Sequence, residues 1–209
     1  WMARHADRLK KPLLAYGLLE LAIGLYALLF PLLLQWAKPL YLEFYRTASP
    51  SPLVFGLFQF LLLSLLLLVP TTCMGATLPL LTRFVSERMG SVGGRVGMLY
   101  GVNTLGAVLG VGLAGFYLLP GFGLKKTLYI AAAGNFILGA SAWALSRRVG
   151  EGGSPPEVLS EEGGEDLSQG LRSLLWIAAL SGCAALIYEL AWFRLLTLIL
   201  GASTYAFST

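Results

Sequence analysis

The stretch LVFGLFQFLLLSLLLLVPTTCMGATLPLL, residues 53–81, holds no Asp, Glu, Lys, Arg or His. As an α-helix it would be about 44 Å long, which exceeds the bilayer's hydrocarbon core of about 30 Å. An apolar run of this length predicts a transmembrane helix. Pro70 and Pro79 bracket a softer segment within it, where we expect a kink or a broken helix.

The rest of the chain has the same apolar character. Four further stretches cover residues 13–34, 96–119, 127–145 and 173–200. Of all 209 residues, 56% are hydrophobic and 12% are charged, against about 25% charged in soluble domains, and the mean hydropathy is +0.73. This composition excludes a disordered chain and argues against a water-soluble enzyme. The sequence therefore predicts an all-α, polytopic integral membrane bundle with about five transmembrane helices, surrounded by membrane lipid.

The connections suggest a division into two membrane parts. Residues 1–146 are predicted to form a four-span block, 147–172 a flexible linker rich in Gly, Ser, Pro and Glu, and 173–209 the start of a second membrane half. We expect 36–52 to be a loop with aromatic side chains at headgroup level, and 120–123 to be a tight turn. Both chain ends look cut, so we expect an interior piece of a longer protein, or a chain completed by helices of other subunits.

The basic residues predict the orientation of the chain. Ten Lys and Arg residues fall on one side of the predicted spans and four on the other, and the side with more faces the cytoplasm. This places the start of the chain and the linker in the cytoplasm, for a protein of the inner (plasma) membrane. The net charge of +4 is therefore a topology signal, and we expect no nucleic-acid partner. The ten are Arg4, Arg8, Lys10, Lys11, Arg83, Arg88, Arg95, Arg147, Arg148 and Arg172.

Three ionisable residues lie inside apolar spans, namely Glu20, Glu189 and Arg194. A charge at the bilayer centre costs several kcal/mol, so each should face protein or water. One interpretation is a binding site for a cationic or zwitterionic substrate, or a proton relay, with Tyr188 and Trp192 beside Glu189 supplying cation–π contacts. The alternative is a structural salt bridge between helices, or an Arg side chain that reaches the outer surface.

The span at 96–119 carries a stripe of small residues. Gly106, Gly110 and Ala114 recur at steps of four, which favours close approach of another helix in lipid. Asn103 on the same span could form a hydrogen bond across that interface. The main interpretation of this stripe of small residues is helix packing.

No catalytic, metal or cofactor site is predicted. The single His5 lies in a loop, and Cys73 and Cys183 lie in separate apolar runs, which leaves no zinc cluster and no disulfide framework. The Gly-rich segment 90–97 follows no strand and lacks a closing Lys-Ser or Lys-Thr pair, so it does not fit a phosphate-binding loop.

Several motifs resemble a known family. Residues 7–12, DRLKKP, resemble the loop between the second and third helices of the major facilitator superfamily, and 88–110 resemble the entry to its fifth helix. PTTCMGATLPLL (70–81), LYGVNTLGA (99–107) and SGCAALIYELAWFR (181–194) together resemble the membrane region of bacterial fused facilitator/spermidine-synthase proteins. The resemblance covers nearly the whole chain except its two polar connections.

The resemblance implies a major-facilitator-like partial bundle containing helices three to seven. Asp7 and Arg8 would then belong to a cytoplasmic gate, and the helix of Glu189 would line a central cavity. The chain would bind or transport a small cationic solute such as a polyamine, or, alternatively, act as a non-transporting subunit that scaffolds a larger complex. Partners would be the missing helices and a soluble spermidine-synthase-like domain. Because this chain shows no pattern of the nucleotide fold that an aminopropyltransferase needs, we lean against an enzymatic role for it.

Overall fold

The computed structural model describes residues 11–89, 92–148 and 164–200, and every element within them is helical. Four helical stretches are long and apolar enough to cross a membrane, which confirms the prediction of an all-helical membrane protein. The elements in chain order are α2 (Pro12–Ala48), α3 (Pro52–Met89), α4 (Val92–Leu113), the π-helix η1 (Ala114–Leu118), α5 (Leu119–Arg148) and α6 (Gly164–Leu200).

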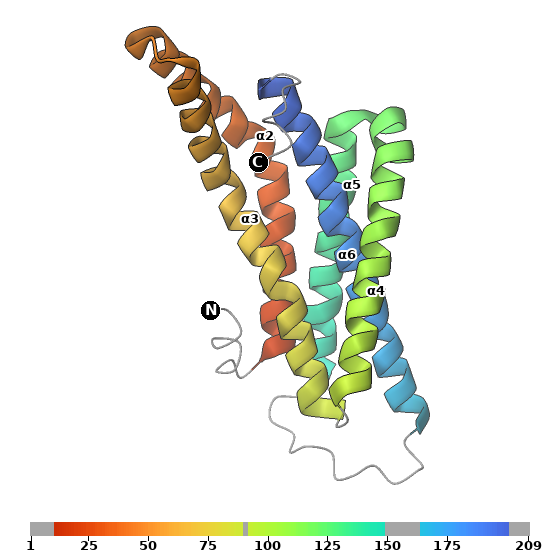
Figure 1. The fold of residues 1–209 in the computed structure, drawn as a ribbon. Coiled ribbons are helices and arrows are strands. Elements are labelled where there is room, and N and C mark those ends of the chain that lie inside the picture. The colour runs from red at the N-terminus through yellow and green to blue at the C-terminus, as the bar shows by residue number, and fades with distance from the viewer. Residues whose placement is uncertain (1–10, 90–91, 149–163, 201–209) are drawn as a thin grey trace.

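The third of these stretches, Gly94–Arg147, contains both of the spans predicted at 96–119 and 127–145. Figure 1 shows the chain reversing direction between α4 and α5. Pro120 lacks an N–H, and just before it the Leu119 N–H bonds to the Ala114 carbonyl in the wider pattern of a π-helix. Gly123 then adopts φ 72° and ψ 172°, a conformation that suits glycine, inside the predicted turn. The count of five spans and the facilitator-like arrangement stay predictions.

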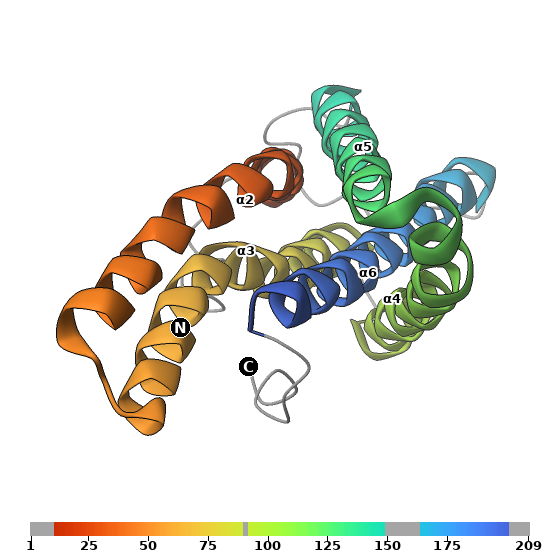
Figure 2. The same ribbon diagram turned by 90° about the horizontal axis from the view of Figure 1, so that it is seen from above.

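The end of α2 and the beginning of α3 form the tip of a hairpin that projects away from α4, α5 and α6, while the first part of α2 packs against α5 (Figures 1 and 2). The prediction of a loop at 36–52 is wrong, because α2 continues through Pro31 and Pro39 to Ala48. Aromatic contacts hold the two helix ends together: the rings of Phe44 and Phe58 stack with centroids 4.3 Å apart, and Tyr45 meets Phe55 edge-on at 4.9 Å. These contacts stabilise helical geometry where the sequence predicted a loop.

Helix α3 is continuous through Pro70 and Pro79, so of the two predicted alternatives, a kink or a broken helix, the broken helix does not occur. Pro70 has no N–H to give to the Leu66 carbonyl, the partner one turn earlier. The Tyr26 hydroxyl of α2 donates to that carbonyl instead, at 2.6 Å, and the Thr71 hydroxyl donates to the Leu67 carbonyl at 2.7 Å. Protein side chains therefore satisfy backbone groups beside this proline.

Tyr26→Phe should test this compensation. Removing the hydroxyl leaves the Leu66 carbonyl without a donor, and we expect a loss of about 0.5–1.5 kcal/mol in the free energy of unfolding. In a Pro70→Ala background the restored backbone N–H can make the bond, so the loss should be smaller. Thermal unfolding of the four proteins of this cycle in detergent measures the difference. Equal losses in both backgrounds would contradict the explanation.

Helix α6 begins earlier than the sequence predicted. Residues 164–172 are helical, although they were assigned to the linker, while 149–163 lie outside the described residues. One end of the molecule holds the beginnings of α2, α4 and α6 and the ends of α3 and α5 (Figure 1). Basic residues predicted to face the cytoplasm lie near these helix ends, among them Lys11, Arg83, Arg95 and Arg147. Which side of a membrane this end faces stays a prediction.

Glycines allow the backbones of two helix pairs, α4 with α6 and α2 with α5, to approach closely. A Cβ at Gly106 would overlap the carbonyl of Ala179, and one at Gly110 would overlap that of Cys183. In the other pair, a Cβ at Gly17 would lie 3.0 Å from the Gly139 carbonyl oxygen. Such close backbone approach is typical of helix association in lipid, where apolar burial alone gives little driving force. Ala114 is fully buried in η1.

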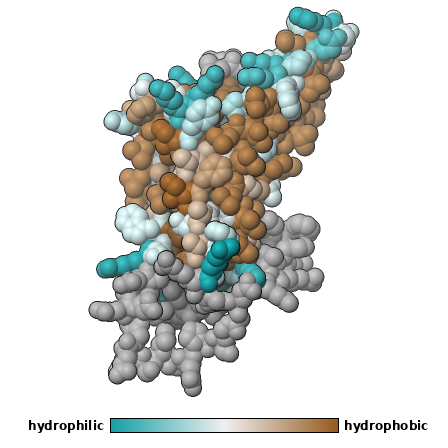
Figure 3. Space-filling model, turned by 180° about the vertical axis from the view of Figure 1, so that it is seen from behind, coloured by the Kyte–Doolittle hydropathy of each residue, from teal (hydrophilic) through white to brown (hydrophobic). Residues whose placement is uncertain are grey.

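One face of the molecule is apolar across its middle. Figure 3, the view from behind, shows this face mainly brown, with hydrophilic side chains at the hairpin tip and beside the grey atoms at the other end. Very little of the apolar window of α3 is buried within the chain. The rest of the described chain therefore leaves most of the apolar surface of α3 uncovered.

Gly106→Leu should destabilise the α4–α6 contact, because the new side chain has no space beside the α6 backbone. We expect a loss of about 1–3 kcal/mol in the free energy of unfolding. Gly101→Leu is the matched control, since nothing lies within 4 Å of a Cβ at that exposed position of the same helix. Thermal unfolding in detergent compares them, and equal effects would contradict close approach at Gly106.

Candidate functional site

The Glu20 carboxylate joins three helices inside the bundle. Glu20 lies on α2 and is 1% exposed. The Asn135 amide of α5 donates to its Oε2 at 2.8 Å, and the Ser181 hydroxyl of α6 donates to its Oε1 at 2.7 Å. Gly24, one turn further along α2, leaves space for Asn135, because a Cβ at Gly24 would lie 3.3 Å from the Cβ of Asn135. The small residues of α2 thus let α5 bring its amide to the carboxylate.

The polar groups around Glu20 are not all satisfied. Among the described residues, Glu20 has no ion-pair partner. The Asn135 Oδ1 atom and the Tyr188 hydroxyl are buried and lack a hydrogen-bond partner within the same part of the chain. Unpaired buried polar groups are costly, so native proteins rarely keep them without a ligand, a water or a functional role. The group can therefore accept a small polar or cationic guest.

A cavity of about 330 Å³ adjoins this carboxylate. Its volume is at the lower end of the range typical of small-molecule sites, about 300–1,000 Å³. Polar side chains from five helices lie among otherwise mainly apolar walls; besides Glu20 they include Thr77, Asn103, Asn135 and Ser181. An apolar cavity with a few convergent polar groups is the usual form of a ligand site.

Glu189 lies at a second, larger cavity of about 610 Å³. It is exposed on α6, and Trp192 and Phe193 line the same cavity. The two cavities share three wall residues, Met74, Ala185 and Leu186. The two acidic residues predicted from the sequence are therefore placed at neighbouring hollows.

The aromatic neighbours of Glu189 are arranged differently from the expectation. Tyr188 is fully buried, and its ring stacks on that of Trp192 with centroids 5.4 Å apart. Trp192 also packs against Phe30 at 5.3 Å. Of the pair, Trp192 alone lines the cavity of Glu189, so Tyr188 does not flank a cation there. Successive side chains on a helix point about 100° apart, which separates Tyr188 from Glu189.

Other predicted residues have separate places. Arg194 is exposed, does not line either cavity and has no ion pair with Glu189 among the described residues. Asn103 lines the cavity of Glu20, and its backbone carbonyl lies against Gly182 of α6. Asp7 and Arg8, expected to form a gate, lie outside the described residues.

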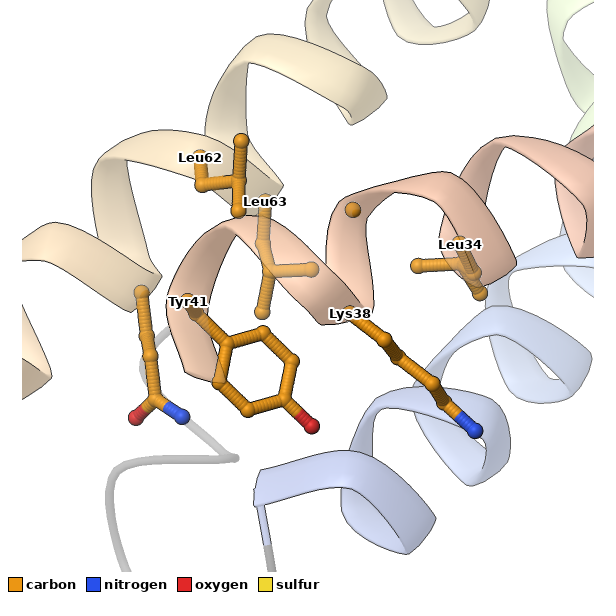
Figure 4. Close-up of a pocket in the computed structure, with 7 residues that line it drawn as sticks. Leu34, Lys38, Tyr41, Leu62 and Leu63 are labelled. Carbon is orange, nitrogen blue, oxygen red and sulfur yellow. The ribbon is translucent and has the colours of Figure 1, made fainter. Parts of the chain in front are cut away.

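A third hollow lies between the α2 and α3 arms of the hairpin. Figure 4 shows Lys38 and Tyr41 projecting from α2 beside Leu62 and Leu63 of α3. Its volume of about 10 Å³ leaves room for no more than a single water molecule. It is not a solute site.

Sequence reasoning missed Asn135 and Ser181. Asn135 stands in the apolar run AAAGNFILGA, where an amide needs a partner, and this was an available signal. Ser181 carried none, because a serine in a membrane helix can satisfy its hydroxyl on its own backbone. Pairing either residue with Glu20 requires knowing which helix faces meet.

Ser181→Ala should weaken the structure around Glu20. The change removes a donor to a buried carboxylate, so we expect a loss of about 1.5–3 kcal/mol in the free energy of unfolding. Ser141→Ala, at an exposed position on α5, is the matched control and should have little effect. Thermal unfolding in detergent measures both, and equal stability of the two variants would argue against a structural hydrogen bond at Glu20.

Among the described residues, no group of three or more His, Cys, Asp or Glu side chains is placed to hold a metal ion. The chain was also compared with protein-family models, with curated proteins and with solved structures, and none of these matches it.

Proposed function

We propose that this chain is the membrane domain of a spermidine-synthase-like facilitator protein, and that it binds a small cationic solute at Glu20. The observation that carries the proposal is the Glu20 carboxylate, which is buried at a cavity and has no ion-pair partner among the described residues. A buried carboxylate in a membrane needs a positive charge, a proton or strong hydrogen bonds. Asn135 and Ser181 supply two donors, and a bound cation would supply the charge.

The surrounding acceptors support a cationic rather than an anionic guest. The free Asn135 Oδ1 and the backbone-bonded Thr77 hydroxyl both present oxygen near the cavity. An ammonium group has three donors and no acceptor, so oxygen-rich surroundings fit it. A primary amine or a polyamine is therefore the solute class that we propose, moved by rocking of two helical halves about the cavity.

The alternative is a non-transporting membrane subunit that scaffolds partners. The observation in its favour is the projecting α2–α3 hairpin, whose α3 arm has very little buried apolar surface. Such a surface fits further membrane helices as well as lipid.

Glu20→Gln should abolish amine binding. The experiment is calorimetry of the full-length gene product in lipid nanodiscs with putrescine, spermidine and decarboxylated adenosylmethionine. We expect saturable binding by the wild type and at least about a tenfold loss in Glu20→Gln, because an ion pair is removed while the side-chain shape is kept. Glu43→Gln is the matched control, since Glu43 is exposed on α2 away from both cavities.

The melting temperature separates loss of binding from loss of structure. Glu20→Gln should melt close to the wild type, because its amide oxygen can accept from Asn135 while its amide N–H donates to the Ser181 hydroxyl, so both contacts are kept. Unfolding of the variant would indicate a structural role for the carboxylate. No binding of any of these compounds by the wild type would sink the transport proposal and favour the scaffold.

A further inference from the structure

The two cavities, one at Glu20 and the other at Glu189, adjoin one another along α6. They share Met74 of α3 and Ala185 and Leu186 of α6 as walls. Ser181 marks the level of Glu20 on α6, since its hydroxyl lies 2.7 Å from Glu20 Oε1. Glu189 follows eight positions later, which corresponds to a rise of about 12 Å along the helix and a net rotation of about 80°. The two carboxylates therefore lie at successive levels of one side of α6.

The residues between the two carboxylates are apolar. The three that line both cavities have Met, Ala and Leu side chains, which offer no polar group to a guest. At one end stand Glu20 and the unpartnered Asn135 Oδ1, and at the other stand Glu189, Trp192 and Phe193. Trp192 and Phe193 give the second end an aromatic wall, which suits a cation.

We propose that the two cavities form one elongated site for an α,ω-diammonium compound, with one ammonium at Glu20 and the other at Glu189. This inference rests on the proposed function, because it assigns the first ammonium to the same Glu20 site. The methylene chain would lie against Met74, Ala185 and Leu186. The rise of about 12 Å is a lower limit for the separation of the two carboxylates, because the rotation of about 80° adds a lateral distance. Each ammonium lies about one hydrogen-bond length inside its carboxylate, which shortens the distance between the nitrogens again. An extended aliphatic chain advances about 1.25 Å per bond, so we expect roughly nine or ten bonds between the nitrogens. The site thus selects a diamine by length.

The test is a length series measured by calorimetry on the full-length protein in nanodiscs. The probes are diamines from 1,3-diaminopropane to 1,12-diaminododecane, each paired with the n-alkylamine of the same carbon number. The alkylamine controls for the apolar contribution of the chain. We expect affinity to be greatest near 1,8-diaminooctane, which should bind about tenfold more tightly than n-octylamine because it gains a second ion pair.

Glu189→Gln should remove the advantage of 1,8-diaminooctane over n-octylamine and leave n-octylamine binding unchanged. Glu43→Gln should leave the advantage intact. Because Glu189 is exposed, the substitution should not disturb folding, and the wild-type length series tests the proposal without any variant.

Two failures are distinguishable. If diamines and monoamines bind equally at every length but depend on Glu20, the bridging site is wrong and the cation site at Glu20 stands. If no amine binds, both proposals fall. An affinity that rises steadily with chain length, in parallel for monoamines and diamines, would show apolar partition alone and would also overturn the bridging site.

Discussion

The arrangement of the bundle depends on the need to satisfy one buried carboxylate. Glu20 draws the Asn135 amide and the Ser181 hydroxyl to its two oxygens, and these donors come from α5 and α6. In a bilayer there is no water to replace a missing partner, so an unsatisfied carboxylate would cost several kcal/mol. The contact therefore fixes which faces of α2, α5 and α6 meet, and it places a charged group at the wall of a cavity.

Glycines make this meeting of helices sterically allowed. Gly24 lets α5 approach α2 beside Glu20, while Gly106 and Gly110 let α6 lie against the backbone of α4. Close approach gains dispersion contacts, which replace the weak hydrophobic driving force between helices in lipid. Glycine packing and polar contact are thus complementary: the former brings the backbones close enough for short side chains to reach across.

Prolines in the long helices illustrate how tertiary contacts override local preference. Pro70 and Pro79 predicted a kink or a broken helix, but α3 is continuous, and Tyr26 from α2 donates to the carbonyl that Pro70 leaves free. In the same way, α2 continues through Pro31 and Pro39 to Ala48, where aromatic residues stack on those of α3. A prediction made for one helix at a time cannot include these donors and rings, because they belong to the neighbouring helix.

Residues 53–81 alone predict the all-helical membrane class, since 29 consecutive uncharged and mainly apolar residues are far more than a membrane strand of about 9–11 residues needs and enough for a membrane-spanning helix. The sequence also marks Glu20 and Glu189 as costly charges that must face protein or water. The packing of the helices was needed to show that Glu20 meets Asn135 and Ser181, and that Tyr188 turns into the core rather than beside Glu189. The reason is physical: hydropathy acts on each residue separately, whereas a polar partner depends on the rotation and depth of two helices.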